Sequence, residues 1–553
     1  MADRHREICA AFRWSVPGDF NIAEWACRRW AGERHRLALQ WEDESGETAA
    51  WTYWDLQQAA NRLSNALHAL GVARGERVAL ILPQRAETIV TYLACFQMGA
   101  IAVPLSFLFG PDALEYRLSD SGARVAIADG DTLPTLQGVR GRLPELAHVI
   151  GCAGAKGDRV LDWDATLAGA SRHFEPPGTL AKDAAAIIYT SGTTGPPKGA
   201  LLPHAALLGN LPGFEHSHDD FPQPGDFFWS PADWAWTGGL WDALMPTLYH
   251  GRAILGYRGR FDAERAFYLL QKYAVRNTFL FPTALKMMMK ACPKPRASFD
   301  LNLRTLMCGG EALGAAVFHW CREELGVTAN EIFGQTEMNY IVGNSHTHWP
   351  VKPGSMGRPY PGHRIAVINA AGNEAAEGEV GDVALNRHGT DGTPDPVFFL
   401  EYWKSPQATA EKYTGDWCRT GDQAMRDADG YLWYQGRADD MFKVSGYRVG
   451  PTEIEDCLLK HPAVANSAVV PSPDDTRGSV VKAFVLLAPG HAPSEALKDS
   501  IREHVKKHLA PYQQPREIEF VGELPMTTTG KVQRKVLRER EAARVTSSGR
   551  RKA

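Results

Sequence analysis

The most informative stretch of the chain is Tyr189-Thr-Ser-Gly-Thr-Thr-Gly-Pro-Pro-Lys-Gly199, which follows the apolar residues 184–188. Glycines let backbone N–H groups approach a phosphate closely, hydroxyl groups donate hydrogen bonds, and Lys198 adds positive charge. The pattern predicts a buried strand, then a loop that wraps polyphosphate, then a helix. The loop is not a Walker A motif, because Lys198 is followed by Gly199 and not by serine or threonine.

Strands and helices alternate on the N-terminal side of this loop. A predicted helix ends at Gly71, and its apolar face is formed by Leu56, Ala60, Leu63, Leu67 and Leu70. Another predicted helix covers 83–98, and buried strands are expected at 78–82, 101–105 and 124–128. This alternation is typical of an α/β domain whose sheet is largely parallel.

The C-terminal part of the chain has a different texture. Between 365 and 440 the segments are short and alternate with turns, and Asp429-Gly430 predicts a β-hairpin. A helix from Thr452, strands at 465–470 and 480–487, and a helix at 494–508 then follow. This order predicts a compact α+β unit that could fold as a separate domain.

The composition sets limits on the function. A chain of 553 residues exceeds one cooperative core, so at least two domains are expected. The net charge of −4 gives no reason to expect nucleic-acid binding. Nine cysteines without a Cys-x-x-Cys pair favour reduced thiols over a metal or disulfide framework. We expect a cytoplasmic protein without a membrane span, because the sequence shows no apolar signal region and no long apolar run.

Further motifs follow the loop in a fixed order: Gly309-Gly-Glu311, Phe333-Gly-Gln-Thr-Glu337, Thr420-Gly-Asp422, Gly436-Arg-Ala-Asp-Asp440, Gly446-Tyr-Arg448 and Thr529-Gly-Lys531. Together with 189–199 they resemble the AMP-forming adenylating superfamily of acyl-CoA synthetases, luciferases and peptide-synthetase adenylation domains. The resemblance covers nearly the whole chain and is strongest to medium-chain acyl-CoA synthetases.

The resemblance implies an α/β fold in two parts. A large N-terminal AMP-binding domain of several subdomains, with mainly parallel sheets and a small barrel-like part, would cover 1–437. A small α+β lid domain would cover 438–541, and the basic residues 542–553 would form a disordered tail.

The resemblance also implies an ATP site. Its residues would be Thr190, Ser191, Gly192, Thr193, Thr194, Gly195, Lys198, Gly310, Glu311, Glu331, Ile332, Phe333, Gly334, Gln335, Thr336, Asp422, Arg437 and Lys531. Among these, Asp422 would accept both ribose hydroxyls, which suits a carboxylate with two acceptor oxygens. A plain turn aspartate and a plain salt-bridge arginine remain the alternatives for Asp422 and Arg437.

Four residues are the expected catalytic groups. A carboxylate that attacks the α-phosphate of ATP meets charge repulsion, so the site should hold cations. Lys531 would bridge the acyl carboxylate and the α-phosphate, with Lys198 adding charge at the loop. Thr336 would donate to the α-phosphate, and Glu337 would bind Mg²⁺, a hard cation that prefers carboxylate oxygens.

The lid is expected to serve the second half of the reaction. The resemblance makes Asp439 the hinge, and Lys443, Ser445, Gly446 and Arg448 the residues at the CoA entry. A solvated charged face is an equally good interpretation of Lys443 and Arg448.

The acyl pocket is expected around Trp234, Trp236 and Gly334. A merely buried aromatic pair is an equally good interpretation of the two tryptophans. Acetyl-specific relatives have a tryptophan at the position of Gly334, so glycine should open the pocket to longer or aromatic acids. On this interpretation, Gly334→Trp would shift the preference towards acetate or propionate.

The sequence therefore predicts an AMP-forming acyl-CoA ligase that uses ATP, Mg²⁺ and coenzyme A. Its substrate would be a medium-chain, branched or aromatic acid. The alternatives are a ligase that delivers the acyl group to a carrier protein and a short-chain ligase for acetate or propionate. Only small molecules are expected as partners, and the oligomeric state, monomer or homodimer, stays open.

Overall fold

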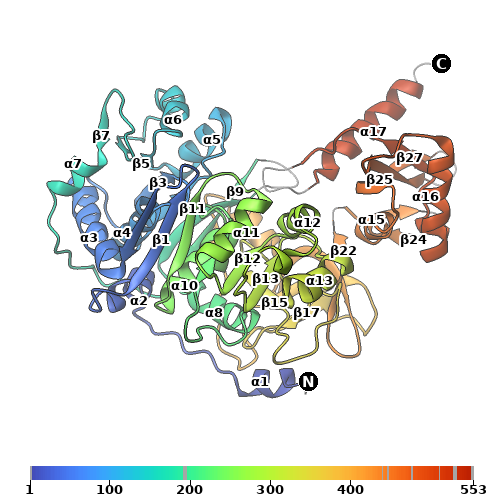
Figure 1. Cartoon of the computed structure of the whole chain (residues 1–553), viewed down its shortest axis with the longest axis horizontal. Coiled ribbons are helices and arrows are strands. Elements are labelled where there is room, and N and C mark those ends of the chain that lie inside the picture. The colour runs from blue at the N-terminus through green and yellow to red at the C-terminus, as the bar shows by residue number, and fades with distance from the viewer. Residues whose placement is uncertain are drawn as a thin grey trace. The chain divides into compact units, whose positions relative to one another are not determined.

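The structure, a computed structural model, describes residues 3–190, 196–438, 440–444, 447–474, 478–509, 511–526 and 532–549 (Figure 1). The chain divides into two compact units. Unit 1 comprises Met1–Arg364 and Asn386–Asp416, and unit 2 comprises Ile365–Leu385 and Trp417–Ala553. Within the described residues, every helix is too short or too polar to cross a lipid bilayer.

The first sheet of unit 1 has the strand order β19, β9, β8, β4, β3, β5, β6, β7. The strands from β8 to β7 in this order run parallel, whereas β9 is antiparallel to both β8 and β19. Their bounds are β3 Arg77–Ile81, β4 Ile101–Pro104, β5 Val125–Ala128, β6 His148–Gly151, β7 Val160–Asp162, β8 Ala184–Thr190, β9 Lys198–Pro203 and β19 Glu401–Tyr402. The predicted parallel α/β pattern is confirmed here.

The second sheet of unit 1 has the strand order β16, β15, β14, β13, β12, β10, β11, β1, β2. Its strands from β14 to β1 run parallel. The bounds are β1 Leu37–Asp43, β2 Thr48–Thr52, β10 Phe228–Trp229, β11 Ile254–Arg258, β12 Asn277–Leu280, β13 Thr305–Gly309, β14 Ala329–Gln335, β15 Asn339–Gly343 and β16 Arg358–Pro359. Figure 1 shows β12 and β13 beside α11, α12 and α13, whose apolar side chains form one core with these two strands.

Helices of unit 1 cover these sheets. The predicted apolar stripe lies on α3, where Leu56, Ala60, Leu63 and Leu67 are buried. Thr52 and Asp55 form a capping box at the start of α3, which satisfies backbone N–H groups there. The principal helices are α1 His5–Ala11, α3 Tyr53–Ala69, α4 Ala86–Met98, α5 Pro111–Ser121, α6 Leu133–Arg140, α8 Ala206–Ser217, α11 Ala263–Lys272, α12 Pro282–Ala291, α13 Ala315–Trp320 and α14 Pro406–Glu411.

Unit 2 contains a small antiparallel sheet and a compact α+β part. The small sheet joins β17 Ile365–Ile368, β18 Gly381–Asn386, β21 Trp417–Arg426 and β22 Leu432–Arg437 in that order, and it includes the predicted hairpin at Gly430. The α+β part contains β23 Phe442–Val444, β24 Tyr447–Val449, α15 Pro451–Leu458, β25 Val464–Asp474, β26 Gly478–Leu487, α16 Glu495–His508, β27 Glu517–Phe520 and α17 Arg534–Gly549. Ile454, Val485, Ile501 and Val505 belong to its apolar core.

The division of the chain differs from the expected boundary after Arg437. The strands of the small sheet group with the C-terminal residues, because sheet hydrogen bonds hold β17 and β18 to β21. The helix α17 also continues to Gly549, into the segment 542–553 that the sequence predicts to be disordered. Ion pairs anchor this helix, since Glu541 accepts a hydrogen bond from the buried Lys482 (2.5 Å) and Arg544 pairs with Glu517 at 2.9 Å.

Candidate active site

Several motifs of unit 1 lie at the carboxyl ends of parallel strands. Gly310 and Glu311 follow β13 directly, Thr336 and Glu337 follow β14, and the segment 230–238 follows β10. The chain continues from β10 to its neighbour β11 on one side and from β12 to its neighbour β13 on the other, so the strand order reverses between β10 and β12. In α/β proteins, ligands bind outside the carboxyl ends of strands at such a switch point.

Side chains from these strand ends contact one another. The hydroxyl oxygens of Thr237 and Thr336 are 3.1 Å apart, which joins the segment after β10 to the segment after β14. Glu311 accepts a hydrogen bond from Thr283 after β12 at 2.9 Å. Glu331, at the centre of β14, accepts from the Leu313 backbone at 3.2 Å. The polar side chains that follow β10, β12, β13 and β14 therefore share one edge of this sheet.

Glu337 is a buried carboxylate with two partners. Glu337 is only 6% exposed, and its Oε1 accepts a hydrogen bond from the Tyr402 hydroxyl. The ammonium group of Lys412 is 3.8 Å from the same Oε1 and donates to Gln335. Because a buried charge needs a partner, the Tyr402 hydroxyl and the Lys412 ammonium group compensate the burial of the Glu337 carboxylate. A carboxylate at a strand end fits a hard cation such as Mg²⁺.

The phosphate loop is framed by two antiparallel strands. Thr190 ends β8 and faces Lys198 at the start of β9, and the Thr190 hydroxyl donates to the Lys198 carbonyl at 3.3 Å. The prediction of a helix directly after the loop is wrong, because residues 198–203 form a buried strand between β8 and β19. The loop residues Ser191, Gly192, Thr193, Thr194 and Gly195 lie outside the described residues.

Lys198 lies near the carboxylate partner Tyr402. Its ammonium group is 5.3 Å from the centre of the Tyr402 ring, within the range of a cation–π contact. Tyr402 therefore contacts both the lysine of the loop and Glu337. This single aromatic side chain links two of the predicted catalytic residues.

Gly334 has a structural reason for being glycine. It lies in β14 at an irregularity in the pairing with β15, next to the buried Ile332 and the partly buried Phe333. A Cβ atom at Gly334 would overlap the carbonyl group of Asn339 in β15. Gly334→Trp therefore cannot serve as a simple test of pocket volume, since even the first side-chain carbon meets backbone.

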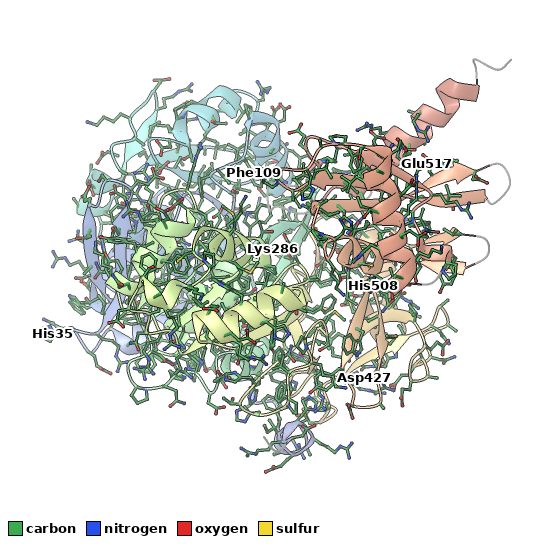
Figure 2. The ribbon with its side chains drawn as sticks, turned by 45° about the vertical axis from the view of Figure 1, so that its right-hand side comes forward. His35, Phe109, Lys286, Asp427, His508 and Glu517 are labelled. Carbon is green, nitrogen blue, oxygen red and sulfur yellow. The ribbon has the colours of Figure 1, made fainter. Side chains whose placement is uncertain are left out.

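The expected acyl-pocket segment contains one core tryptophan and one partly exposed tryptophan. Trp234 is fully buried, whereas Trp236 is half-buried and packs edge-to-face on Phe109, with ring centres 5.6 Å apart. Phe109 is labelled in Figure 2. Nearby, burial raises the pKa of Asp233 to about 6, although Ser106 donates to this carboxylate at 2.7 Å. Trp236 and Phe109 are thus the better candidates for a pocket wall.

The predicted ribose-binding group lies in unit 2, on the hairpin of β21 and β22. Asp422 is 7% exposed and directly faces Arg437 in the strand register. Its Oδ2 accepts from Arg437 at 3.3 Å, and its Oδ1 accepts from the Tyr434 hydroxyl at 3.2 Å. Burial and the neighbouring Asp422 carboxylate raise the pKa of Tyr434, so the hydroxyl keeps its proton and donates.

The remaining predicted residues of unit 2 are described only in part. The backbones of Lys443 and Arg448 face each other in the pairing of β23 with β24, and their side chains are not among the parts that the structure describes. Asp439, Ser445, Gly446 and Lys531 also lie outside the described residues. Asp440, next to the predicted hinge, accepts hydrogen bonds from Arg534 and Arg538 of α17.

Three contacting residues were missed by the sequence analysis: Thr237, Tyr402 and Lys412. Each belongs to a segment that has no phosphate-binding motif, and each contacts a predicted residue across more than 60 positions of sequence. Thr237 could have been found from the sequence, because it is adjacent to Trp236, which was predicted to line the acyl pocket. For Tyr402 and Lys412 the sequence carries no such signal, because a lone tyrosine and a lone lysine are common on any surface.

Comparison with known proteins agrees with the motif order. Residues 25–390 match the family model described as AMP-binding enzyme, and residues 453–531 match the AMP-binding enzyme C-terminal domain. The chain belongs to the AMP-binding enzyme family. The predicted family and fold class are confirmed.

Similar proteins include ligases from bacteria and mammals. An uncharacterised acyl-CoA ligase of Bacillus subtilis, YtcI, is 34% identical over 95% of this chain and 97% of its own length. The mitochondrial acyl-coenzyme A synthetase ACSM4 of Rattus norvegicus is 34% identical over 96% of this chain and 92% of its own. Among solved structures, the anthranilate CoA ligase AuaEII in complex with anthranoyl-AMP is 30% identical, with a TM-score of 0.85, over 95% of this chain and 98% of its own.

Proposed function

We propose that this chain is an AMP-forming acyl-CoA ligase. In the first step, a carboxylate oxygen attacks the α-phosphorus of ATP, the bond to the bridging oxygen breaks, and pyrophosphate leaves. In the second step, the sulfur of coenzyme A attacks the acyl carbon and the thiol proton is released. The bond between the acyl carbon and the bridging oxygen breaks, and AMP leaves with that oxygen. The products are a thioester and AMP.

The observation that carries this proposal is that Glu337 contacts Tyr402 and Lys412, that Lys198 lies over the Tyr402 ring, and that Thr336 precedes Glu337 in the chain. These cations and hydroxyl donors suit a polyphosphate, and the buried carboxylate suits a divalent cation. Mg²⁺, when bound, would neutralise part of the phosphate charge. Both contacts of Glu337 go to Oε1, so we expect Oε2 to face the cation.

The other predicted roles fit this reaction. Asp422 would accept the ribose hydroxyls, and Gly310, Glu311 and the residues of β14 would flank adenine. Lys531 would contact the reacting carboxylate, Asp439 would be the hinge, and the CoA contacts would come from Lys443, Ser445, Gly446 and Arg448. The expected cytoplasmic location stays a prediction, since ACSM4 is a mitochondrial protein.

We further propose a medium-chain, branched or aromatic acid as the substrate. The half-buried Trp236 and Phe109 offer aromatic faces for such an acyl group. The similarity to an anthranilate CoA ligase supports an aromatic acid in particular.

The test is AMP release with ATP and Mg²⁺ across straight-chain acids from acetate to dodecanoate, with benzoate and anthranilate, each with and without coenzyme A. We expect CoA-dependent turnover that is highest for medium-chain or aromatic acids. The highest turnover with acetate would contradict the proposed substrate class. Adenylate formation that never yields a thioester would instead support transfer to a carrier protein.

A further inference from the structure

A group of metal-ligating side chains lies in unit 1, on segments that the proposed reaction does not use. One ring nitrogen of His216, one of His348 and a carboxylate oxygen of Asp220 all lie within 4.8 Å of one another. His216 belongs to α8, Asp220 follows α8 within three residues of its end, and His348 follows β15. The elements α8 and β15 are labelled in Figure 1.

The contacts in this group are specific. The Nε2 atom of His348 is 2.7 Å from Oδ1 of Asp220. The rings of His216 and His348 are 5.2 Å apart and nearly perpendicular, so they meet edge to face. His348 is 9% exposed. Nδ1 of His216 and Nδ1 of His348 are both buried without a hydrogen-bond partner among the described residues.

Buried ring nitrogens without partners cost free energy, so the arrangement calls for a ligand or a second role. Polar contacts hold the group in place. The His346 backbone donates to Asn330 at 3.0 Å, Asn330 donates to the Ser217 carbonyl at 2.8 Å, and the Arg4 backbone donates to the His348 carbonyl at 2.9 Å. The two histidine-bearing segments are therefore fixed to each other by residues outside the group.

We propose that His216, Asp220 and His348 form a binding site for a divalent transition-metal ion of the zinc class. Two imidazoles and one carboxylate suit Zn²⁺, Ni²⁺ or Cu²⁺ better than Mg²⁺, which prefers oxygen ligands alone. The carboxylate of Asp220 is 55% exposed, so water can fill the remaining coordination positions.

Small movements complete the geometry. Ligand atoms on one tetrahedral zinc ion are about 3.3 Å apart, given bonds of about 2.0–2.1 Å. The ligand atoms lie within 4.8 Å of one another, so side-chain rotations that move them by about an ångström reach this value. The exposed Asp220 would exchange its contact with His348 for the ion. A bound ion would connect the end of α8 to the segment that follows β15 and stabilise both.

A different group of possible ligands in unit 2 must be separated from this one. Cys457, His504 and His508 lie within the same distance limit, and His508 is labelled in Figure 2. There, one ring nitrogen of His504 contacts the Cys457 carbonyl at 3.1 Å, and one of His508 contacts the His504 carbonyl at 2.7 Å. One nitrogen of each ring is thus engaged with backbone and the other can still bind a metal, so the experiment must distinguish the two groups.

The test uses the full-length protein, stripped of metal with a chelator and titrated calorimetrically with Zn²⁺ and separately with Mg²⁺, without ATP. We expect saturable Zn²⁺ binding and a rise in the unfolding temperature, neither of which Mg²⁺ produces. His348→Ala should weaken Zn²⁺ binding at least about tenfold. Asp220→Asn, at an exposed position that should not impair folding, should weaken it in the same direction.

The controls are His35→Ala, at an exposed histidine labelled in Figure 2, and the double variant His504→Ala/His508→Ala. Both should bind Zn²⁺ like the unchanged protein. Absence of Zn²⁺ binding would overturn the proposal and leave the histidines as packing for Trp349. Binding that survives in His348→Ala but disappears in the double variant would also overturn it, because the metal would then belong to unit 2.

Discussion

Glu337 in unit 1 and Asp422 in unit 2 are stabilised by the same chemistry in two different folds. Each is a buried carboxylate, 6% and 7% exposed, and each contacts one tyrosine hydroxyl and one cation. Tyr402 and Lys412 serve Glu337, whereas Tyr434 and Arg437 serve Asp422. In both places a buried negative charge is acceptable because a cation and a hydroxyl replace its lost water.

The origin of the partners differs between the two sites. Tyr434 and Arg437 lie 12 and 15 residues from Asp422, on the next strand of the same hairpin. Tyr402 lies 65 residues from Glu337 and reaches it from a different sheet. The local site is thus built by one turn, whereas the distant site depends on the packing of all of unit 1. The two should respond differently to substitution.

The largest expected effect is that of Glu337→Gln, which keeps the size of the side chain and removes its charge. One charge at about 4 Å in an effective dielectric of about 20 is worth roughly 4 kcal/mol, so acid-dependent AMP release should fall about a thousandfold. The matched control is Glu401→Gln at an exposed position. A fall of less than about tenfold would show that Glu337 does not hold the cation.

The position of Glu337 depends on the close approach of β14 and β15, which Gly334→Ala should disrupt. Because the added carbon overlaps the Asn339 carbonyl, we expect a loss of about 3 kcal/mol in the free energy of unfolding. Thermal unfolding of Gly334→Ala and Gly334→Trp measures this loss, and both should be destabilised. A fully stable Gly334→Ala with normal acid preference would contradict the steric explanation.

Asp422→Asn tests the carboxylate of unit 2. Hydrogen bonds to a charged acceptor are worth about 2–3 kcal/mol, so the KM for ATP should rise about 30- to 150-fold. The discrimination between ATP and 2′-deoxy-ATP should shrink in the variant, because the ribose acceptor is weakened. Equal discrimination in both proteins would show that Asp422 does not contact the ribose.

Lys412 and Arg437 should differ in whether bound Mg²⁺ and ATP can replace the charge that each of them supplies. Removing one partner of a buried pair leaves a charge uncompensated, so Lys412→Met and Arg437→Met should each cost about 2 kcal/mol of stability. Mg²⁺ with ATP should restore most of the loss in Lys412→Met, because the metal would supply charge at Glu337. The exposed Lys286→Met, on α12 in Figure 2, is the control. If Mg²⁺ with ATP restored the stability of Lys412→Met and Arg437→Met equally, this expected difference between the two sites would be contradicted.

The smallest expected effect belongs to the hydroxyl groups. Tyr402→Phe and Tyr434→Phe each remove one hydrogen bond to a carboxylate and should lower stability by about 1 kcal/mol. Tyr402→Phe keeps the ring near Lys198, so its catalytic effect should stay below that of Glu337→Gln. Differential scanning calorimetry and AMP release measure the two quantities. Loss of activity in Tyr402→Phe as large as in Glu337→Gln would make the hydroxyl a catalytic group.

Local patterns predicted much of the fold. The stripe of α3 is buried, the strands at β3, β4 and β5 are parallel, and Asp429-Gly430 joins β21 to β22. These features depend on periodicity and turn chemistry, which act over a few residues. The strand β9 lies where a helix was predicted, because the prediction followed the strand–loop–helix arrangement of phosphate loops, whereas pairing with β8 and β19 decides the structure there.

By itself the sequence determined the family, the motif order and the residue types that are expected to face ATP, because glycines, hydroxyls and charges in a fixed order carry that chemistry. Only the tertiary structure showed that Tyr402 and Lys412 stabilise Glu337, that Gly334 is required by backbone contact, and that His216, Asp220 and His348 meet. The reason is physical. Burial and long-range contact decide which charge is paired, and those depend on how distant strands pack and not on any local pattern.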